Sequence, residues 1–202
     1  MYVENKIEFS QALYIIIINR KVDTMQLKAM TEETKDYLKA LYEESFPIEE
    51  RRPFSLLEQE VEQGFMELLV MEVDHVPSGL VFTSFQGELA LLEFLAIDEK
   101  KRGQGLGSQV LSLLKERYKE KRFFLEIETP MMDNNTDIRY RREQFYIQNG
   151  FLPIGVFVLF QGVKMKLLSL YGEKVTFEEY KEHYEKTVGL SYAKKMGIEQ
   201  DF

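Results

Sequence analysis

The sequence predicts a mixed α/β fold of the α+β type, in which helices flank a mostly antiparallel sheet. Three strand-like runs, at 67–73, 80–85 and 88–97, are joined by links too short for a parallel crossover, so we expect them to be antiparallel neighbours. Helical and strand patterns alternate after these runs. Hydrophobic residues make up 45% of the 202 positions and aromatic residues 13%, which is enough apolar material for one packed core.

The first elements lie between residues 25 and 64. Residues 25–30 alternate in polarity as a short strand does, and Thr31 stands where a helix cap is expected. The apolar positions of that helix are Tyr37, Leu38, Leu41 and Tyr42. After a charged connection, Pro53 is expected to open a second short helix, which extends to about Val61 and is closed by Gly64.

Turn residues separate the central strands and the elements that follow them. We expect breaks at 77–79 and 86–87, each of which contains a glycine. A glycine-rich turn then leads into a helix that ends near Tyr118. A strand at 123–129 and a helix at 137–149 come next.

The C-terminal part reads as a hairpin followed by a helix. Residues 151–160 and 163–170 would pair around a Gln-Gly turn. Thr176 and Glu179 have the spacing of a capping box, and the helix that they open would turn Tyr180 and its neighbour one turn on inward.

Three segments are therefore expected. Residues 25–172 form the domain, and 173–202 form a C-terminal helical appendage. Residues 1–24 form an extension that is either dispensable or an added strand. Such a strand would pair with an exposed sheet edge of this chain or of a partner, and the second case is compatible with a homodimer.

Composition excludes several functions. The chain has no cysteine, so it has neither disulfides nor thiolate nucleophiles. His75, in a turn, and His183, on a charged helix, each lack a spaced partner; we expect both to be solvated and expect no metal site. The net charge of -8 argues against a nucleic-acid surface. The same charge could draw cationic molecules to an acidic cleft, or it could simply keep the protein soluble. The longest N-terminal apolar run is too short to span a membrane, and no signal-peptide pattern accompanies it, so a cytoplasmic location is expected.

The most informative motif follows the third central strand. Arg102 begins the run Arg-Gly-Gln-Gly-Leu-Gly, which opens a helix. Glycines allow backbone N–H groups to approach a ligand closely, and the helix N-terminus attracts anions, so this turn predicts a pyrophosphate site. A Walker loop would need a lysine before Ser108, and a dinucleotide fingerprint would need a third glycine at that position.

The pattern R/Q-x-x-G-x-G/A is satisfied from Arg102 to Gly107, and the sequence resembles the GNAT superfamily of acyl-coenzyme A-dependent N-acetyltransferases. A second family feature is the run Phe145-Tyr146-x-x-Asn149-Gly150-Phe151, and the element order fits over about 25–170. The resemblance implies acetyl-coenzyme A as co-substrate and no metal. It implies cofactor contacts at Leu95, Ile97, Lys101, Arg102, Gly103, Gln104, Gly105, Leu106, Gly107 and Ser108. Many relatives carry an asparagine where this chain has Arg139, so that contact is not carried over.

The resemblance also implies catalytic roles. Tyr146 would protonate the departing thiolate, and the alternative is a tyrosine that only packs on its helix. The N–H group of Ile97 would stabilise the oxyanion. Glu93 is the strongest candidate for the general base, directly or through water, because it lies on the strand before the turn among apolar neighbours. Strand alternation would place Glu93, Leu95 and Ile97 on one face, and the alternative for Glu93 is an ordinary exposed residue.

The acceptor site is less well defined. Glu126 and Glu128 would share a strand face and line an acidic pocket, unless that face is merely solvated. Phe46 begins the connection that shapes the acceptor pocket in relatives. We therefore expect an N-acetyltransferase that moves an acetyl group onto a primary amine of a small molecule or protein by direct attack in a ternary complex. The alternatives are a catalytically silent acyl-coenzyme A-binding regulatory module and, less favoured, a nucleotide binder. No nucleic-acid or membrane partner is expected.

Overall fold

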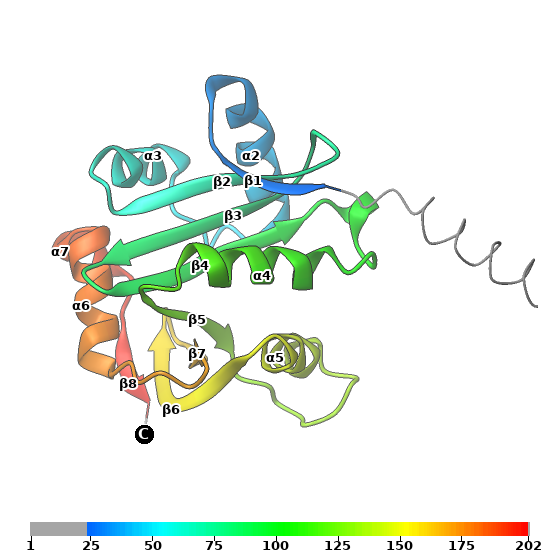
Figure 1. Ribbon diagram of the computed structural model, residues 1–202. Helices are drawn as coiled ribbons and strands as arrows, with labels where there is room; N and C mark the ends of the chain where they lie inside the picture. Colours follow the sequence, from blue (N-terminus) through cyan, green and yellow to red (C-terminus); the bar gives the residue numbers. More distant parts are fainter. Residues whose placement is uncertain (1–23, 202) are drawn as a thin grey trace, which may run out of the picture.

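The computed structural model describes residues 24–201, and it contains one eight-stranded sheet with helices on both faces (Figure 1). The strand order is β1-β2-β3-β4-β5-β7-β6-β8. The strands are β1 (Met25–Ala29), β2 (Met66–Val73), β3 (Val76–Gln86), β4 (Leu89–Ile97), β5 (Arg122–Glu128), β6 (Phe151–Phe160), β7 (Val163–Leu170) and β8 (Glu199–Asp201). Among these strands only β4 and β5 pair in parallel, so the predicted fold class is confirmed. The expectations for residues 1–23 lie outside the described residues.

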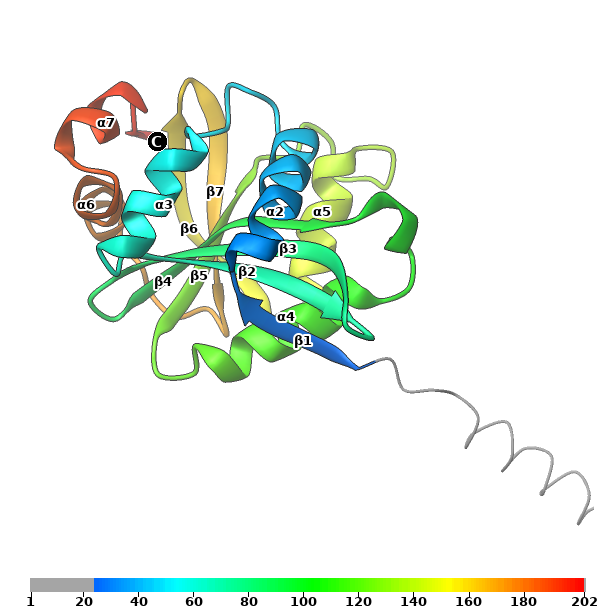
Figure 2. The same ribbon diagram turned by 90° about the horizontal axis from the view of Figure 1, so that it is seen from above.

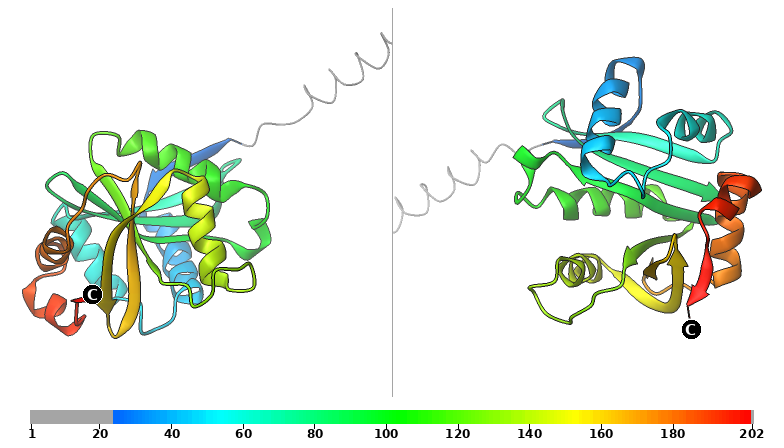
Figure 3. Two further views of the ribbon diagram at one scale, coloured as in Figure 1. Left: turned by 90° about the horizontal axis from the view of Figure 1, so that it is seen from below. Right: turned by 180° about the vertical axis from the view of Figure 1, so that it is seen from behind.

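The helices divide between the two faces of the sheet. They are α2 (Glu32–Ser45), α3 (Phe54–Glu62), α4 (Leu106–Arg117), α5 (Ile138–Gln148), α6 (Phe177–Thr187) and α7 (Leu190–Lys195), with a short 3-10 turn η1 (Glu99–Lys101) before α4. Helices α2 and α3 cover one face and α4 the other (Figure 2). Helices α6 and α7 lie beside β8 at the end of the sheet (Figure 3). In the described part of the chain no helix is long and apolar enough to cross a membrane.

Three apolar clusters fill the space between the sheet and its helices. The first joins Val110, Leu111 and Leu114 of α4 to the strands. The second holds α2 and α3 against β2–β4, and the third holds α6 and α7 against β4, β5 and β7. Neighbouring residues of β4 belong to different clusters, because successive side chains of a strand point to opposite faces. The strand β4 is therefore buried from both sides.

The expected break at 77–79 is wrong, because these residues lie inside β3. The turn is formed by Asp74 and His75, both with positive φ, and β3 begins directly after them. Gly79 serves close packing instead. A Cβ atom there would lie 2.6 Å from the Ala96 carbonyl oxygen and 2.6 Å from the Met71 side chain. The glycine therefore allows β3 to approach its neighbours closely.

The expectation of a solvated His183 is also wrong. His183 is fully buried on the inner side of α6, and its Nε2 lies 2.7 Å from the Ser84 hydroxyl on β3. Its ring meets Phe124 edge to face, and its Nδ1 has no partner among the described residues. Burial lowers the pKa of His183 from 6.5 to about 4. The imidazole is thus neutral in the folded chain, and α6 is tied to the central sheet.

The buried His183 predicts a specific dependence of stability on pH. Because its folded pKa is lowered, the contribution is present above pH 6.5 and is lost as the pH falls toward 4, up to about 3 kcal/mol. We expect His183→Gln, which keeps a polar group for Ser84 but does not titrate, to remove this part of the acid sensitivity. Denaturant unfolding of both proteins from pH 7 to pH 4 measures the difference; parallel stability curves would contradict the assignment.

Candidate active site

The strands β4 and β5 diverge, and the opening between them is the centre of the site. They pair only from Leu89–Leu92 with Arg122–Leu125, after which β5 pairs with β7 alone. The N–H group of Asp98 points to β3, where it donates to the Ser78 carbonyl at 3.0 Å. Since hydrogen-bonding direction alternates along an antiparallel strand, the N–H groups of Leu95 and Ile97 point the other way, into the opening.

The glycine-rich turn lies at the end of β4. Gly103 and Gly105 both have φ of 76°, a left-handed conformation that favours glycine, and a Cβ atom at either would meet nothing within 4 Å. Gly107 has a different role, because a Cβ there would lie 3.0 Å from the ring of Phe145 on α5. Gly107 thereby allows α4 and α5 to lie close together, and Leu106 anchors the start of α4 in the core.

The start of α4 leaves its first N–H groups free for a ligand. Gly105 is the N-cap and supplies no side-chain cap, and residues 102–105 are exposed. Asp98 accepts from the N–H of Lys100 and fixes η1, while the Arg102 Nε donates to the Ile97 carbonyl at 3.0 Å. Lys101, Gln104 and Ser108 surround the same turn. These residues fit a diphosphate group, since free N–H groups, a helix N-terminus and cationic side chains converge there.

Tyr146 lies on the same side of the sheet as the turn. Its half-buried ring packs on Phe145 and Phe151, with ring centroids 5.2 and 6.1 Å apart. It belongs to the same apolar cluster as Leu95 and Ile97. Burial raises the pKa of Tyr146 to about 12, and its hydroxyl makes no hydrogen bond to the described residues. The phenol therefore keeps its proton at neutral pH.

Glu93 lies on the opposite face, so the expected alternation with Leu95 and Ile97 is wrong. Phe82 pairs with Phe94, whereas the next residue of β3 pairs with Leu92, which makes Glu93 the extra residue of a β-bulge. The bulge turns the Glu93 side chain to the face of Phe94. That side chain is only 2% exposed although the residue as a whole is half-buried, so the exposed part of Glu93 is its main chain.

The surroundings of Glu93 also differ from the apolar ones expected. Arg52, in the connection between α2 and α3, donates from Nη1 to Glu93 Oε2 at 2.5 Å and from Nη2 to Glu60 Oε2 at 2.9 Å. All three side chains are 3% exposed or less. Glu93 Oε1 and Glu60 Oε1 have no partner among the described residues. Burial raises the pKa of Glu60 to about 7.

The sequence contained a signal for this buried ion triad. Glu60 follows Leu57 by three residues and Phe54 by six, so it stands on the apolar stripe of α3. A charged residue at such a position needs a buried partner. Its partner Arg52 could not be identified, because nothing distinguishes it from the neighbouring Arg51 before folding.

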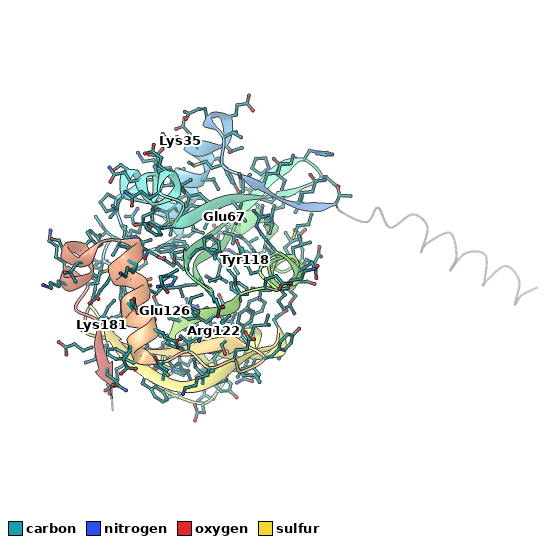
Figure 4. The ribbon with its side chains drawn as sticks, turned by 60° about the vertical axis from the view of Figure 1, so that its left-hand side comes forward. Lys35, Glu67, Tyr118, Arg122, Glu126 and Lys181 are labelled. Atoms are coloured by element: carbon teal, nitrogen blue, oxygen red, sulfur yellow. The ribbon has the colours of Figure 1, made fainter. Side chains whose placement is uncertain are left out.

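Glu126 and Glu128 share a strand face but have different surroundings. Glu126 lies beside α6 (Figure 4). It accepts hydrogen bonds from the hydroxyls of Tyr180 and Tyr184 on this helix, the latter at 2.8 Å. Burial raises the pKa of Glu126 to about 7. Glu128 is bound at 2.8 Å by Arg139, the residue at the family's asparagine position. Glu126 is thus a buried carboxyl group held by two tyrosines, whereas Glu128 is paired with an arginine.

Phe46 contributes to the core more than to an open pocket. Its ring meets Phe94 at 4.9 Å and Tyr42 at 5.8 Å between centroids, under α2. The rest of its connection approaches β5 and α5. Glu50 in this connection is exposed, and the charges of Arg142 on α5 and Glu128 on β5 act on its carboxyl group. The connection therefore borders the same side of the opening as the carboxyl groups.

Comparisons with known proteins agree with this arrangement. The model of the Acetyltransferase (GNAT) family matches residues 29–143. A putative GNAT acetyltransferase from Bacteroides thetaiotaomicron has a similar structure, with a TM-score of 0.64 and 22% identity over 86% of this chain and 99% of that chain.

Two further solved structures share the fold. The Arabidopsis thaliana protein Naa50, in complex with the bisubstrate analogue CoA-Ac-MVNAL, has a TM-score of 0.54 and 16% identity over 72% of this chain and 97% of that chain. A chimera of the Vibrio cholerae spermidine N-acetyltransferase SpeG with hSSAT has a TM-score of 0.57 and 15% identity, over 72% of this chain and 94% of that chain. No curated protein matches the sequence. Because the family model covers more than half of the chain, and the opening between β4 and β5 adjoins the glycine-rich turn, the chain belongs to the GNAT family of acetyltransferases.

Proposed function

We propose that the chain transfers an acetyl group from acetyl-coenzyme A to a primary amine by direct attack in a ternary complex. The observation that carries this proposal is the continuity of two features. The free N–H groups at the start of α4 lie directly beyond the strand β4, whose N–H groups at Leu95 and Ile97 point into the opening. One surface thus offers donors both for a diphosphate and for a developing oxyanion.

In this proposal the cofactor is held from the α4 side. The N–H groups of residues 103–108 bind the diphosphate, and Lys101 and Arg102 add positive charge. Arg102 is already oriented, because its Nε is bound to the Ile97 carbonyl and leaves the other guanidinium nitrogens for the anion. Acetyl-coenzyme A supplies an acyl thioester, whose carbon accepts the amine. The main chain of Leu95 and Ile97 lines the opening beside it.

The chemistry then divides between the two faces of the sheet. An ammonium group must lose a proton before its nitrogen can attack, and Glu93, directly or through water, receives that proton. The N–H group of Ile97 stabilises the negative charge that develops on the carbonyl oxygen. As the carbon–sulfur bond breaks, the thiolate leaves with the electron pair and takes a proton from Tyr146. The second proton of the new amide nitrogen then restores the phenol.

The burial of Glu93 favours a second candidate. A carboxylate that is 2% exposed and bound to Arg52 is a poor contact for a substrate, which is the arrangement expected of a silent acyl-coenzyme A-binding module. A panel of amines read by thiol release separates the two. Binding of acetyl-coenzyme A without thiol release from any amine would support the silent module, whereas saturable release supports the enzyme.

The ligand class can be tested separately from turnover. At a hundredfold excess over its dissociation constant, a ligand of the folded state raises the free energy of unfolding by about 2.7 kcal/mol. We expect this stabilisation with acetyl-coenzyme A and not with NAD or ATP. A thermal-shift comparison of the three ligands measures it, and stabilisation by NAD or ATP alone would contradict the proposed cofactor.

We predict that Gly105→Glu abolishes binding of acetyl-coenzyme A, because it places a carboxylate among N–H groups that face the diphosphate. Gly87→Glu is a matched control. Gly87 also has positive φ and free space around it, but lies in the turn between β3 and β4. Both variants carry the same left-handed strain, about 1–2 kcal/mol. Calorimetric titration should find binding lost only at position 105; equal loss in both would mean that strain, and not charge, is responsible.

We predict that Tyr146→Phe lowers kcat roughly 10²-fold with little change in cofactor affinity, as expected when a general acid is lost. Tyr140→Phe, on the same helix, is the control and should keep full turnover. Steady-state kinetics with the best amine of the panel measures both. Full turnover by Tyr146→Phe would leave the tyrosine with only its packing against Phe145 and Phe151.

A further inference from the structure

The C-terminal helix α6 lies outside residues 29–143, yet it reaches the centre of the sheet. A capping box at Thr176 and Glu179 fixes its start, with both bonds formed. Three of its buried residues carry polar groups that point toward the sheet: Tyr180, His183 and Tyr184. The two tyrosine hydroxyls bind Glu126 on β5, and the imidazole meets Ser84 on β3. The polar groups of these three residues are therefore directed at the strands that form the site.

Glu93 and Glu126 occupy equivalent places on the two diverging strands. The last parallel pair joins Leu92 to Leu125, so each glutamate is the first residue beyond it. Both side chains face away from α4, because the bulge turns Glu93 to the side of Arg52 and Glu126 faces α6. Burial raises the pKa of Glu126 most, and the charge of Glu93 raises it further, as expected for carboxyl groups on the same face of adjacent strands.

The surrounding charges do not balance. Glu60, Glu93 and Glu126 supply three buried carboxyl groups, and Arg52 supplies one guanidinium. Full ionisation would leave two uncompensated negative charges out of water, which is costly. In addition, Glu93 Oε1 is buried without a partner among the described residues. The cluster therefore favours binding of a proton near neutral pH.

We propose that Glu126, positioned by Tyr180 and Tyr184, is a second proton-accepting carboxyl group of the acetyl-transfer site, which works as a pair with Glu93 and makes α6 part of the active site. This inference rests on the proposed function. The ammonium of the acceptor gives one proton to the Glu93–Glu126 pair, and the neutral amine attacks the thioester. The proton leaves to solvent after the transfer, so atoms and charge balance without another reactant.

The pair explains how a carboxyl group can act as a base here. Two carboxylates on one face of adjacent strands bind a first proton more strongly than either would alone, because the proton relieves their repulsion. Burial adds to this effect at Glu126, whose pKa of about 7 suits a base that operates at neutral pH.

Each group that faces Glu126 acts on its pKa in a known direction. The hydroxyls of Tyr180 and Tyr184 on α6 stabilise the carboxylate and lower the pKa. Arg52 also lowers it, and Glu93 on β4 raises it. The residue opposite on β7 is Leu167, which carries no charge. Removal of a tyrosine hydroxyl and removal of the Glu93 charge should therefore move the pKa in opposite directions.

These opposite shifts are the test. The acidic limb of the pH profile of kcat/KM reports the pair, because the base must be deprotonated. We expect the double variant Tyr180→Phe, Tyr184→Phe to move this limb to higher pH. In the residual activity of Glu93→Gln, we expect the acidic limb to lie at lower pH than in the wild type. Glu126→Gln should lower kcat/KM on the order of 10²-fold and leave the dissociation constant of acetyl-coenzyme A unchanged.

The controls distinguish this role from a structural one. Tyr192→Phe, on the adjacent α7, removes a hydroxyl that does not contact Glu126 and should leave the profile unchanged. If the double variant does not fold, Tyr184→Phe alone should give a smaller shift in the same direction. Profiles that all coincide with the wild-type profile would overturn the pairing while the acetyltransferase stands. Absence of thiol release with every amine, despite binding of acetyl-coenzyme A, would overturn the proposed function and this inference with it.

Discussion

The divergence of β4 from β5 is the constraint on which the rest of the site depends. Four residue pairs hold the two strands together, and beyond Leu92 and Leu125 the polar main chain of β4 has no strand beside it on that edge. Buried N–H and C=O groups require partners, so such an edge is stable only if water or a ligand reaches it. The glycine-rich turn and α4 follow directly, and the opening is therefore continuous with an anion-binding helix start.

A buried ion triad keeps the opposite side of the opening in place. Arg52 joins the connection before α3, the helix α3 through Glu60 and the strand β4 through Glu93. Its main chain is also held, because its N–H donates to the Tyr42 hydroxyl at 2.9 Å. Removing one member of a buried pair costs about 3–5 kcal/mol, since the remaining charge loses its partner. The triad therefore fixes the geometry of the bulge as well as the charge of the site.

The sequence predicted the elements well and the contacts between distant elements poorly. The capping box of α6, the glycine-rich turn before α4 and the periodicity of α4 are local patterns, and the corresponding helices agree with the prediction. Glu93 was placed on the wrong face because a bulge has no signature in strand alternation. His183 was expected in water because burial of one histidine depends on Ser84, which is 99 residues away. The cofactor positions remain predictions that binding measurements test.

The two sides of the opening are built from different parts of the chain, and this bears on how acceptors are selected. The turn, α4 and the edge of β4 all lie within residues 29–143, the part that the family model matches. The opposite side combines Arg52 and Glu60 from that part with Tyr180 and Tyr184 from α6, beyond it. A diphosphate is bound mainly by main-chain N–H groups at a helix start, whereas discrimination among acceptors depends on the shape and charge of side chains. Under the proposed function, changes in α6 would therefore alter the acceptor side while the donor side stays as it is.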